Sequence, residues 1–137
     1  DVAPSRGLGD VYKRQMYIKK EDQAATVRQT VMGGKGEILS RIFLDPKDAA
    51  GAGRLFAVNT IAPGCSIGYH SHEGEFEVYY ILSGTAKIVD EGEEYLLHAG
   101  DMMQCKSGHA HSIENAGEAP LEHIALILYE NPAHVTD

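Results

Sequence analysis

The chain is poor in the residues that mark membrane, nucleic-acid-binding and disulfide-rich proteins. Among 137 residues it has no tryptophan, 2 cysteines and 5 prolines, and aromatic residues make up 7%. Its 12 Lys and Arg residues face 20 Asp and Glu residues, a formal net charge of -8, so no basic stripe is available for nucleic-acid phosphates. No apolar run is long enough to cross a bilayer, and none has a secretory pattern. We therefore expect neither nucleic acid nor a membrane as a partner.

The two cysteines, Cys65 and Cys105, lie far apart and form no CxxC pattern. A disulfide between them and two free thiols both fit the sequence. Two buried thiols in a reducing cytoplasm are the simpler account. We therefore predict a cytoplasmic protein in which both side chains act as small apolar groups.

The first residues differ in character from the rest of the chain. The stretch from Ser5 to Gln15 resembles the in-frame translation of a transposon adapter used to prepare DNA sequencing libraries, and Met16 follows directly. We interpret residues 1–15 as a non-native extension; the alternative is a natural N-terminal arm. The remaining chain is predicted to form an arm or edge strand at 16–36, a β-barrel domain at 37–131 and a tail at 132–137.

Short strand-like segments separated by turn residues fill the chain from Glu37 onward. Glycine, Asn and Asp punctuate them, and these residues tolerate the left-handed backbone of tight turns. No segment keeps a helical period, so the pattern indicates an all-β sandwich or barrel. The expected strands are Glu37–Leu44, Arg54–Ala62, Ser66–His72, Phe76–Leu82, Thr85–Val89, Glu93–His98, Met102–Cys105, His109–Glu114 and Leu121–Tyr129. In the preceding arm, one more strand is hinted at by Thr26, Val27, Thr30 and Val31.

Three histidines and one glutamate have the spacing of a metal site. His70 and His72 are two apart in an extended segment, so alternation places both side chains on one face. Glu77 lies an odd number of residues from either, so the chain must bend between them, and we expect Gly74 to supply the turn. His111 comes from a later strand. Imidazoles with one carboxylate suit one divalent transition metal, with Mn, Fe, Ni, Zn, Co and Cu all compatible.

These residues stand in two blocks that resemble the two motifs of the cupin superfamily. The first motif is matched by Gly64, His70, His72, Glu77 and Gly84, and the second by Gly100, Gly108, His111 and Asn115. Lys106 stands where the family has a proline, which puts the rigidity of that turn in question but touches no ligand. The chain is similar to small single-domain bacterial cupins of the type-2, oxalate-decarboxylase-like group. The resemblance implies a double-stranded β-helix or jelly-roll barrel, with the metal held by His70, His72, Glu77 and His111.

The resemblance also implies a function at the metal. It suggests an enzyme acting on a small oxygenated organic acid or sugar, of decarboxylase, isomerase or dioxygenase type. The alternatives are a non-catalytic cupin that binds or senses a small ligand, and a cupin that keeps these residues but holds no metal. No general base is evident, so the catalytic residues stay unknown and the choice between enzyme and binding protein stays open.

Other residues near the motifs have two interpretations each. His109 could face the cavity with His111 or lie on a solvent-exposed turn, and His123 could project inward beside the site. His98 is a third candidate of undefined role. Glu73 and Glu75 could lie at the mouth of the barrel, but we interpret them as solvated loop carboxylates. We interpret Tyr79 as a residue packed in the core.

One strand is apolar on both faces. Val78, Tyr80 and Leu82 would form an outer face too apolar for a solvated sheet. We predict a homodimer that covers this face; the alternative is coverage by the chain's own N-terminal segment.

Overall fold

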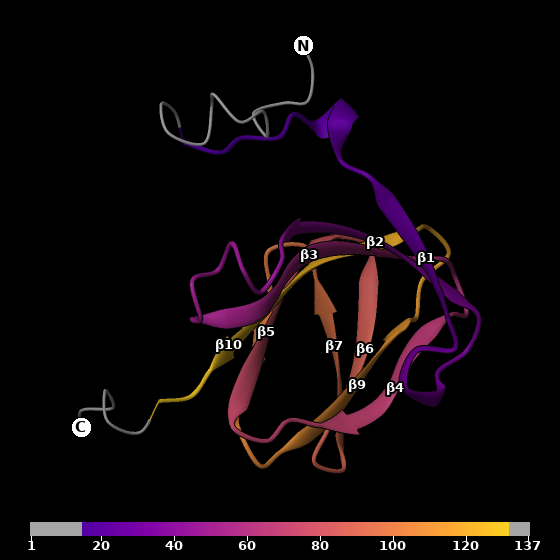
Figure 1. The fold of residues 1–137 in the computed structure, drawn as a ribbon. Helices are drawn as coiled ribbons and strands as arrows, with labels where there is room; N and C mark the ends of the chain where they lie inside the picture. Colours follow the sequence, from indigo (N-terminus) through magenta and orange to yellow (C-terminus); the bar gives the residue numbers. More distant parts are fainter. Residues whose placement is uncertain (1–14, 132–137) are drawn as a thin grey trace.

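The computed structural model describes residues 15–131, which fold into two antiparallel β-sheets that face each other around a common interior (Figure 1). The expected extension at 1–15 and the tail at 132–137 lie, apart from Gln15, outside the described residues. No helix among residues 15–131 has the length and apolar character needed to cross a bilayer. The predicted all-β jelly-roll fold is confirmed.

The larger sheet has six strands in the order β1-β2-β3-β10-β5-β8, and the smaller has four in the order β4-β9-β6-β7. In chain order the strands are β1 (Ala25–Gln29), β2 (Glu37–Leu44), β3 (Gly53–Ile61), β4 (Ser66–Ser71), β5 (Glu75–Ser83), β6 (Thr85–Asp90), β7 (Glu93–His98), β8 (Met102–Cys105), β9 (Ala110–Asn115) and β10 (Leu121–Tyr129). Two short 3-10 turns, η1 (Lys20–Asp22) and η2 (Val31–Gly33), flank β1. From β2 onward, the strand ends match the predicted ones to within one residue.

The hydrophobic core lies between the two sheets. Alternation along the strands points apolar side chains inward, and six of them, from both sheets, are fully buried: Ile38, Ile61, Ile81, Ile88, Ile113 and Leu121. Each such side chain contributes about 1.5–3 kcal/mol when it leaves water. This apolar frame fixes the strands that carry the histidine and glutamate side chains.

The predicted first strand ends earlier than the sequence suggested. Thr30 adopts a left-handed backbone with φ 43° and Met32 one with φ 53°, so the chain leaves the sheet after β1 and turns through η2. The η2 backbone then packs so closely on β4 that a side chain at Gly68 would collide with the carbonyl of Met32. Val31 is therefore buried in a turn over the barrel interior and does not continue the strand.

Both cysteines are free in the structure, as predicted. Cys105 is buried in the core and Cys65 is half-buried. Burial raises the pKa of the Cys105 thiol to about 11, which is the environment of a packing residue and not of a reactive thiolate.

Candidate metal centre

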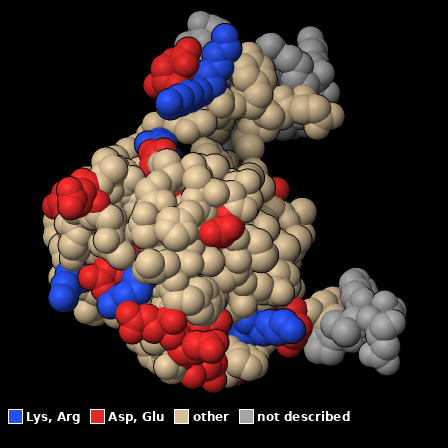
Figure 2. Space-filling model, turned by 180° about the vertical axis from the view of Figure 1, so that it is seen from behind, with Lys and Arg blue, Asp and Glu red and all other residues tan. Residues whose placement is uncertain are grey.

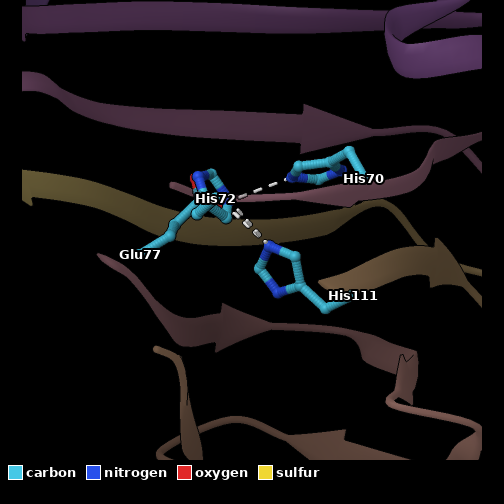
Figure 3. Close-up of side chains that lie close together, drawn as sticks. All are labelled: His70, His72, Glu77 and His111. Carbon is cyan, nitrogen blue, oxygen red and sulfur yellow. Dashed lines mark hydrogen bonds and ion pairs between the residues drawn. The ribbon is translucent and has the colours of Figure 1, made fainter. Parts of the chain in front are cut away.

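The four predicted ligands meet inside the barrel from three strands (Figure 3). His70 on β4 pairs directly with His111 on β9, His72 follows the end of β4, and Glu77 lies on β5. One ligand atom from each lies within 4.8 Å of all the others. The Nε2 atoms of His72 and His111 are each 3.0 Å from Oε1 of Glu77, and Nε2 of His70 is 3.6 Å from it.

A tight turn after β4 allows Glu77 to join the two histidines, as the sequence parity required. Gly74 has φ 74°, and its amide donates to Oγ of Ser107 at 3.0 Å. A Cβ atom at Gly74 would meet nothing within 4 Å, so the glycine is needed for its left-handed backbone and not for space. The bend sends β5 back beside the site with Glu77 facing inward.

The outer nitrogens of two histidines are held by acceptors on the protein. Nδ1 of His70 donates to the carbonyl of Gly68 at 2.7 Å, and Nδ1 of His72 donates to Oε2 of Glu75 at 2.6 Å. A neutral imidazole that donates from Nδ1 carries a lone pair on Nε2, so both Nε2 lone pairs face the Glu77 carboxylate. Lone pairs and a carboxylate in this arrangement suit a shared cation, which is a proton in a histidine–glutamate hydrogen bond and could equally be a transition-metal ion.

The protonation states of the four side chains also favour a bound cation. Burial acts to raise the pKa of Glu77, but the interactions with the neighbouring imidazoles of His111, His70 and His72 outweigh it and hold this pKa well below its usual range. The bond to Glu77 raises the pKa of His72, whereas burial lowers the pKa of His111. Glu77 is thus an ionised carboxylate with 4% exposure, and no Lys or Arg among residues 15–131 forms an ion pair with it. A buried charge of this kind needs a positive partner.

The expectation of a solvated Glu75 is wrong. Its side chain is buried, and both carboxylate oxygens accept from Arg54, at 2.6 Å from Nε and 2.7 Å from Nη2. The bond from Arg54 lowers the pKa of Glu75, so the carboxylate that orients His72 stays ionised. Its shared parity with Glu77 on β5 was the signal in the sequence. Glu73 is exposed, as expected.

Tyr79 and His123 extend the site into the core. The Tyr79 ring stacks on His111 with centroids 4.7 Å apart and an interplanar angle of 11°, and it meets His123 edge-on at 4.7 Å. His123 is fully buried and projects inward, as one interpretation held. The side chains of His109 and His98 are exposed on the surface and do not belong to the four-residue cluster, so the cavity-facing interpretation of His109 is wrong.

The turn that carries Lys106 is held without the family's proline. The amide of Gly108 donates to the carbonyl of His72 at 2.7 Å, and the amide of His72 donates to the carbonyl of His109 at 3.1 Å. This backbone pairing fixes the turn against the end of β4. The other motif residue, Asn115, is buried and makes three side-chain hydrogen bonds of 2.8 Å, which gives it a structural role.

A cavity of about 60 Å³ opens beside the four side chains. A water molecule needs roughly 10–15 Å³ of such space, so the cavity has room for about four to six waters. Besides three of the four candidate ligands, its wall is formed by the polar residues Arg28, Arg54, Asn59 and Tyr79 and the apolar residues Val31, Met32, Leu55, Ile67 and Ile127. The space suits a molecule of a few heavy atoms.

Comparison with known proteins places this arrangement in a family. The chain is 45% identical to the oxalate-binding protein of Thermotoga maritima over 113 residues, which is 82% of this chain and 93% of that protein. Its fold superposes with a TM-score of 0.81 and 38% identity on the crystal structure of a predicted oxalate decarboxylase from Thermotoga maritima, covering 84% of this chain and 100% of that one. KdgF from Halomonas sp. shares the fold alone, with a TM-score of 0.69 and 16% identity over 88% of this chain and 99% of that one. The family model described as a cupin domain matches residues 57–127, and the chain belongs to the cupin family.

Proposed function

We propose that the protein binds one divalent transition-metal ion through His70, His72, Glu77 and His111 and, beside it, a small oxygenated organic acid. The observation that supports this most directly is the convergence of three imidazole nitrogens and one ionised carboxylate within 4.8 Å. When bound, such an ion supplies Lewis acidity and coordination positions that the oxygens of an organic acid can occupy. Glu75 and the Gly68 carbonyl hold two of the imidazoles in the orientation this requires.

Oxalate is the first ligand to test. The chain is 45% identical to a protein named for oxalate binding, and the cavity of about 60 Å³ has a size that suits a two-carbon acid better than a sugar. Oxalate offers two carboxylates and no apolar part. Its oxygens would face the metal-ligand cluster and the polar part of the wall.

Binding without turnover is better supported than catalysis. Decarboxylation or isomerisation needs a group beside the ligand that can give or take a proton near neutral pH. Among the described residues that line the cavity, Glu77 is the one carboxylate and belongs to the ligand set, and no Lys or Cys is present. The nearby Glu75 carboxylate is already bonded to Arg54 and His72. Catalysis is the second candidate, supported by the likeness to a predicted oxalate decarboxylase.

Metal analysis of protein purified without added metal tests the proposal. We expect about one ion per chain by mass spectrometry, and loss of that ion in a His70→Ala/His111→Ala double variant. A His98→Ala/His109→Ala variant is the matched control, because it removes two exposed histidines outside the cluster. Unchanged metal content in the ligand double variant would show that the site is wrongly assigned.

Calorimetric titration of the metal-loaded protein with oxalate then tests the ligand. Incubation with carbon-13 oxalate, followed by NMR for formate and carbon dioxide, separates binding from decarboxylation. Saturable binding without product supports the binding function. Product that forms with wild type and disappears with the ligand double variant would make the protein an enzyme.

We also propose that a second copy of the chain covers the outer face of the larger sheet. Tyr80 and Leu82 on β5 and Met102 on β8 are 40–52% exposed, and Tyr80 and Met102 are direct cross-strand partners. Strand β1 of the N-terminal arm does not cover them, because it lies at the opposite edge of this sheet. In the view of Figure 2, Asp and Glu outnumber Lys and Arg on the visible surface, and several acidic side chains gather along its lower margin. Light scattering should give a dimer that Leu82→Lys dissociates; a wild-type monomer would contradict it.

The cytoplasmic location and bacterial source stay predictions.

A further inference from the structure

We infer that Arg28 binds the second carboxylate of the ligand and makes the cavity selective for a small dicarboxylate over a monocarboxylate. The inference rests on the proposed function, because it assigns the charge of the ligand held beside the metal-ligand cluster. Nothing in the sequence distinguished Arg28 from the other basic residues of the chain. The assignment rests on its place in the cavity wall, on the lack of an acidic partner for it among the described residues, and on the hydrogen bonds that support it.

Arg28 is the inward-facing side chain near the end of the edge strand β1. Its neighbours Val27 and Gln29 are exposed, with Val27 at 53%, whereas Arg28 is half-buried and lines the cavity. Across the strand pair it lies opposite Ile38, which is fully buried. The edge strand therefore delivers one cationic side chain to the cavity while its other residues face solvent.

The two arginines in the cavity wall differ in their partners. Arg54 gives Nε and Nη2 to the two oxygens of Glu75, so its charge is neutralised within the protein. Arg28 donates from Nη1 to the Ser40 hydroxyl at 3.5 Å, and among residues 15–131 no carboxylate pairs with it. Its charge is thus available for an acidic group of a ligand. A guanidinium presents parallel N–H groups that match the two oxygens of a carboxylate.

A row of hydrogen bonds in the buried core supports the Arg28 guanidinium. The Ser40 hydroxyl accepts from Arg28 and donates to Oδ1 of Asn59 at 2.7 Å. Nδ2 of Asn59 then faces Nε2 of His123 at 3.4 Å, and Nδ1 of His123 donates to the carbonyl of Ile124 at 3.1 Å. Ser40, Asn59 and His123 are at most 2% exposed. Buried polar groups are costly unless each is bonded, so this satisfied row is a support that orients the guanidinium.

Charge balance selects the class of ligand. A divalent ion with the Glu77 carboxylate leaves one net positive charge, which a monocarboxylate would neutralise. Arg28 adds a second positive charge to the same small cavity, so a ligand with two negative charges would neutralise the ion, Glu77 and Arg28 taken together. The apolar part of the wall, formed by residues such as Val31 and Ile127, lowers the local dielectric and so strengthens this charge selection.

The test compares oxalate with glycolate, which has similar size and one carboxylate. Metal content of each protein is measured first, and both acids are then titrated into metal-loaded wild type, Arg28→Met, Arg28→Lys and Arg41→Met. Arg41 is the matched control, since it lies on β2, points to the outer face of the same sheet and pairs with Glu122. All four proteins are compared at equal metal loading.

We expect wild type to bind oxalate more tightly than glycolate. Arg28→Met should lose about tenfold to a hundredfold in oxalate affinity and keep its glycolate affinity within about threefold, because a bond to a charged group is lost for one acid alone. Arg28→Lys should fall between the two, and Arg41→Met should match wild type. Oxalate affinity unchanged in Arg28→Met, or an equal loss for both acids, would overturn the inference while the metal site stands. Wild type that takes up no metal would overturn the proposed function and this inference with it.

Discussion

Acid should destabilise this protein through the protonation of His123. The ring is fully buried, with Asn59 at one nitrogen and the Ile124 carbonyl at the other. Burial lowers the pKa of His123 to about 4, from an ordinary value of 6.5. A proton added to Nε2 would place two donors face to face, since the amide of Asn59 already points there. The folded state therefore requires the neutral ring.

The sign and size of the effect follow from this difference. Because the folded pKa lies below the unfolded one, the stabilisation is complete above pH 6.5 and is lost as the pH falls toward about 4. The gap corresponds to about 3 kcal/mol of unfolding free energy in total, at about 1.4 kcal/mol for each pH unit. At pH 5, about 2 kcal/mol of it should already be gone.

Urea unfolding of metal-free wild type and His123→Gln at pH 7.5 and pH 5 measures this term. Glutamine cannot gain a proton in this range, and its side-chain oxygen can accept from Asn59. Wild type should lose about 2 kcal/mol more than the variant between the two pH values, whatever the stability of the variant at pH 7.5. His109→Gln, which replaces an exposed turn histidine, should follow wild type. Equal losses in wild type and His123→Gln would refute the buried neutral ring.

Three further predictions concern other parts of the molecule. Glu75→Gln should lower metal affinity about 10- to 100-fold in a chelator competition, because His72 loses its ionised orienting partner; unchanged affinity would contradict that role. In the native protein Cys65 should react with DTNB well before Cys105, whose burial raises its pKa to about 11, and equal rates would show that the core opens readily. Asn115→Ala should lower the unfolding free energy by about 2–4 kcal/mol in urea, because it removes three hydrogen bonds, one buried and two part-buried; a loss below about 1 kcal/mol would contradict the structural role.

The strands could be read from the sequence because their signal is local. Alternation and glycine-containing turns set each strand end from β2 onward, and parity forced the bend at Gly74. The end of β1 could not be predicted in this way. Thr30 is β-branched and favours extended backbone, yet it takes φ 43° because η2 packs against β4, a contact distant in sequence. Tertiary contact overrode local preference there.

The position of a site residue could be predicted where it shares a strand face with a known candidate. Its role could not be predicted where that role depends on a side-chain partner from a distant strand. Glu75 shares the parity of Glu77, so its inward position could have been read, but its bond to Arg54 joins two strands that are not neighbours in either sheet.

Arg28 and Arg54 show the same limit more sharply. Both are arginines that line one cavity, and sequence pattern alone cannot rank them. The structure separates them through their partners: Glu75 neutralises Arg54, whereas Arg28 contacts the Ser40 hydroxyl and pairs with no carboxylate of the part of the chain that the structure describes. Arg54 thereby orients His72, a candidate metal ligand, through Glu75, and Arg28 keeps its charge for the proposed ligand. The two arginines of this cavity thus have different roles. The difference arises because β5 places the Glu75 carboxylate against Arg54, whereas β2 places the Ser40 hydroxyl against Arg28.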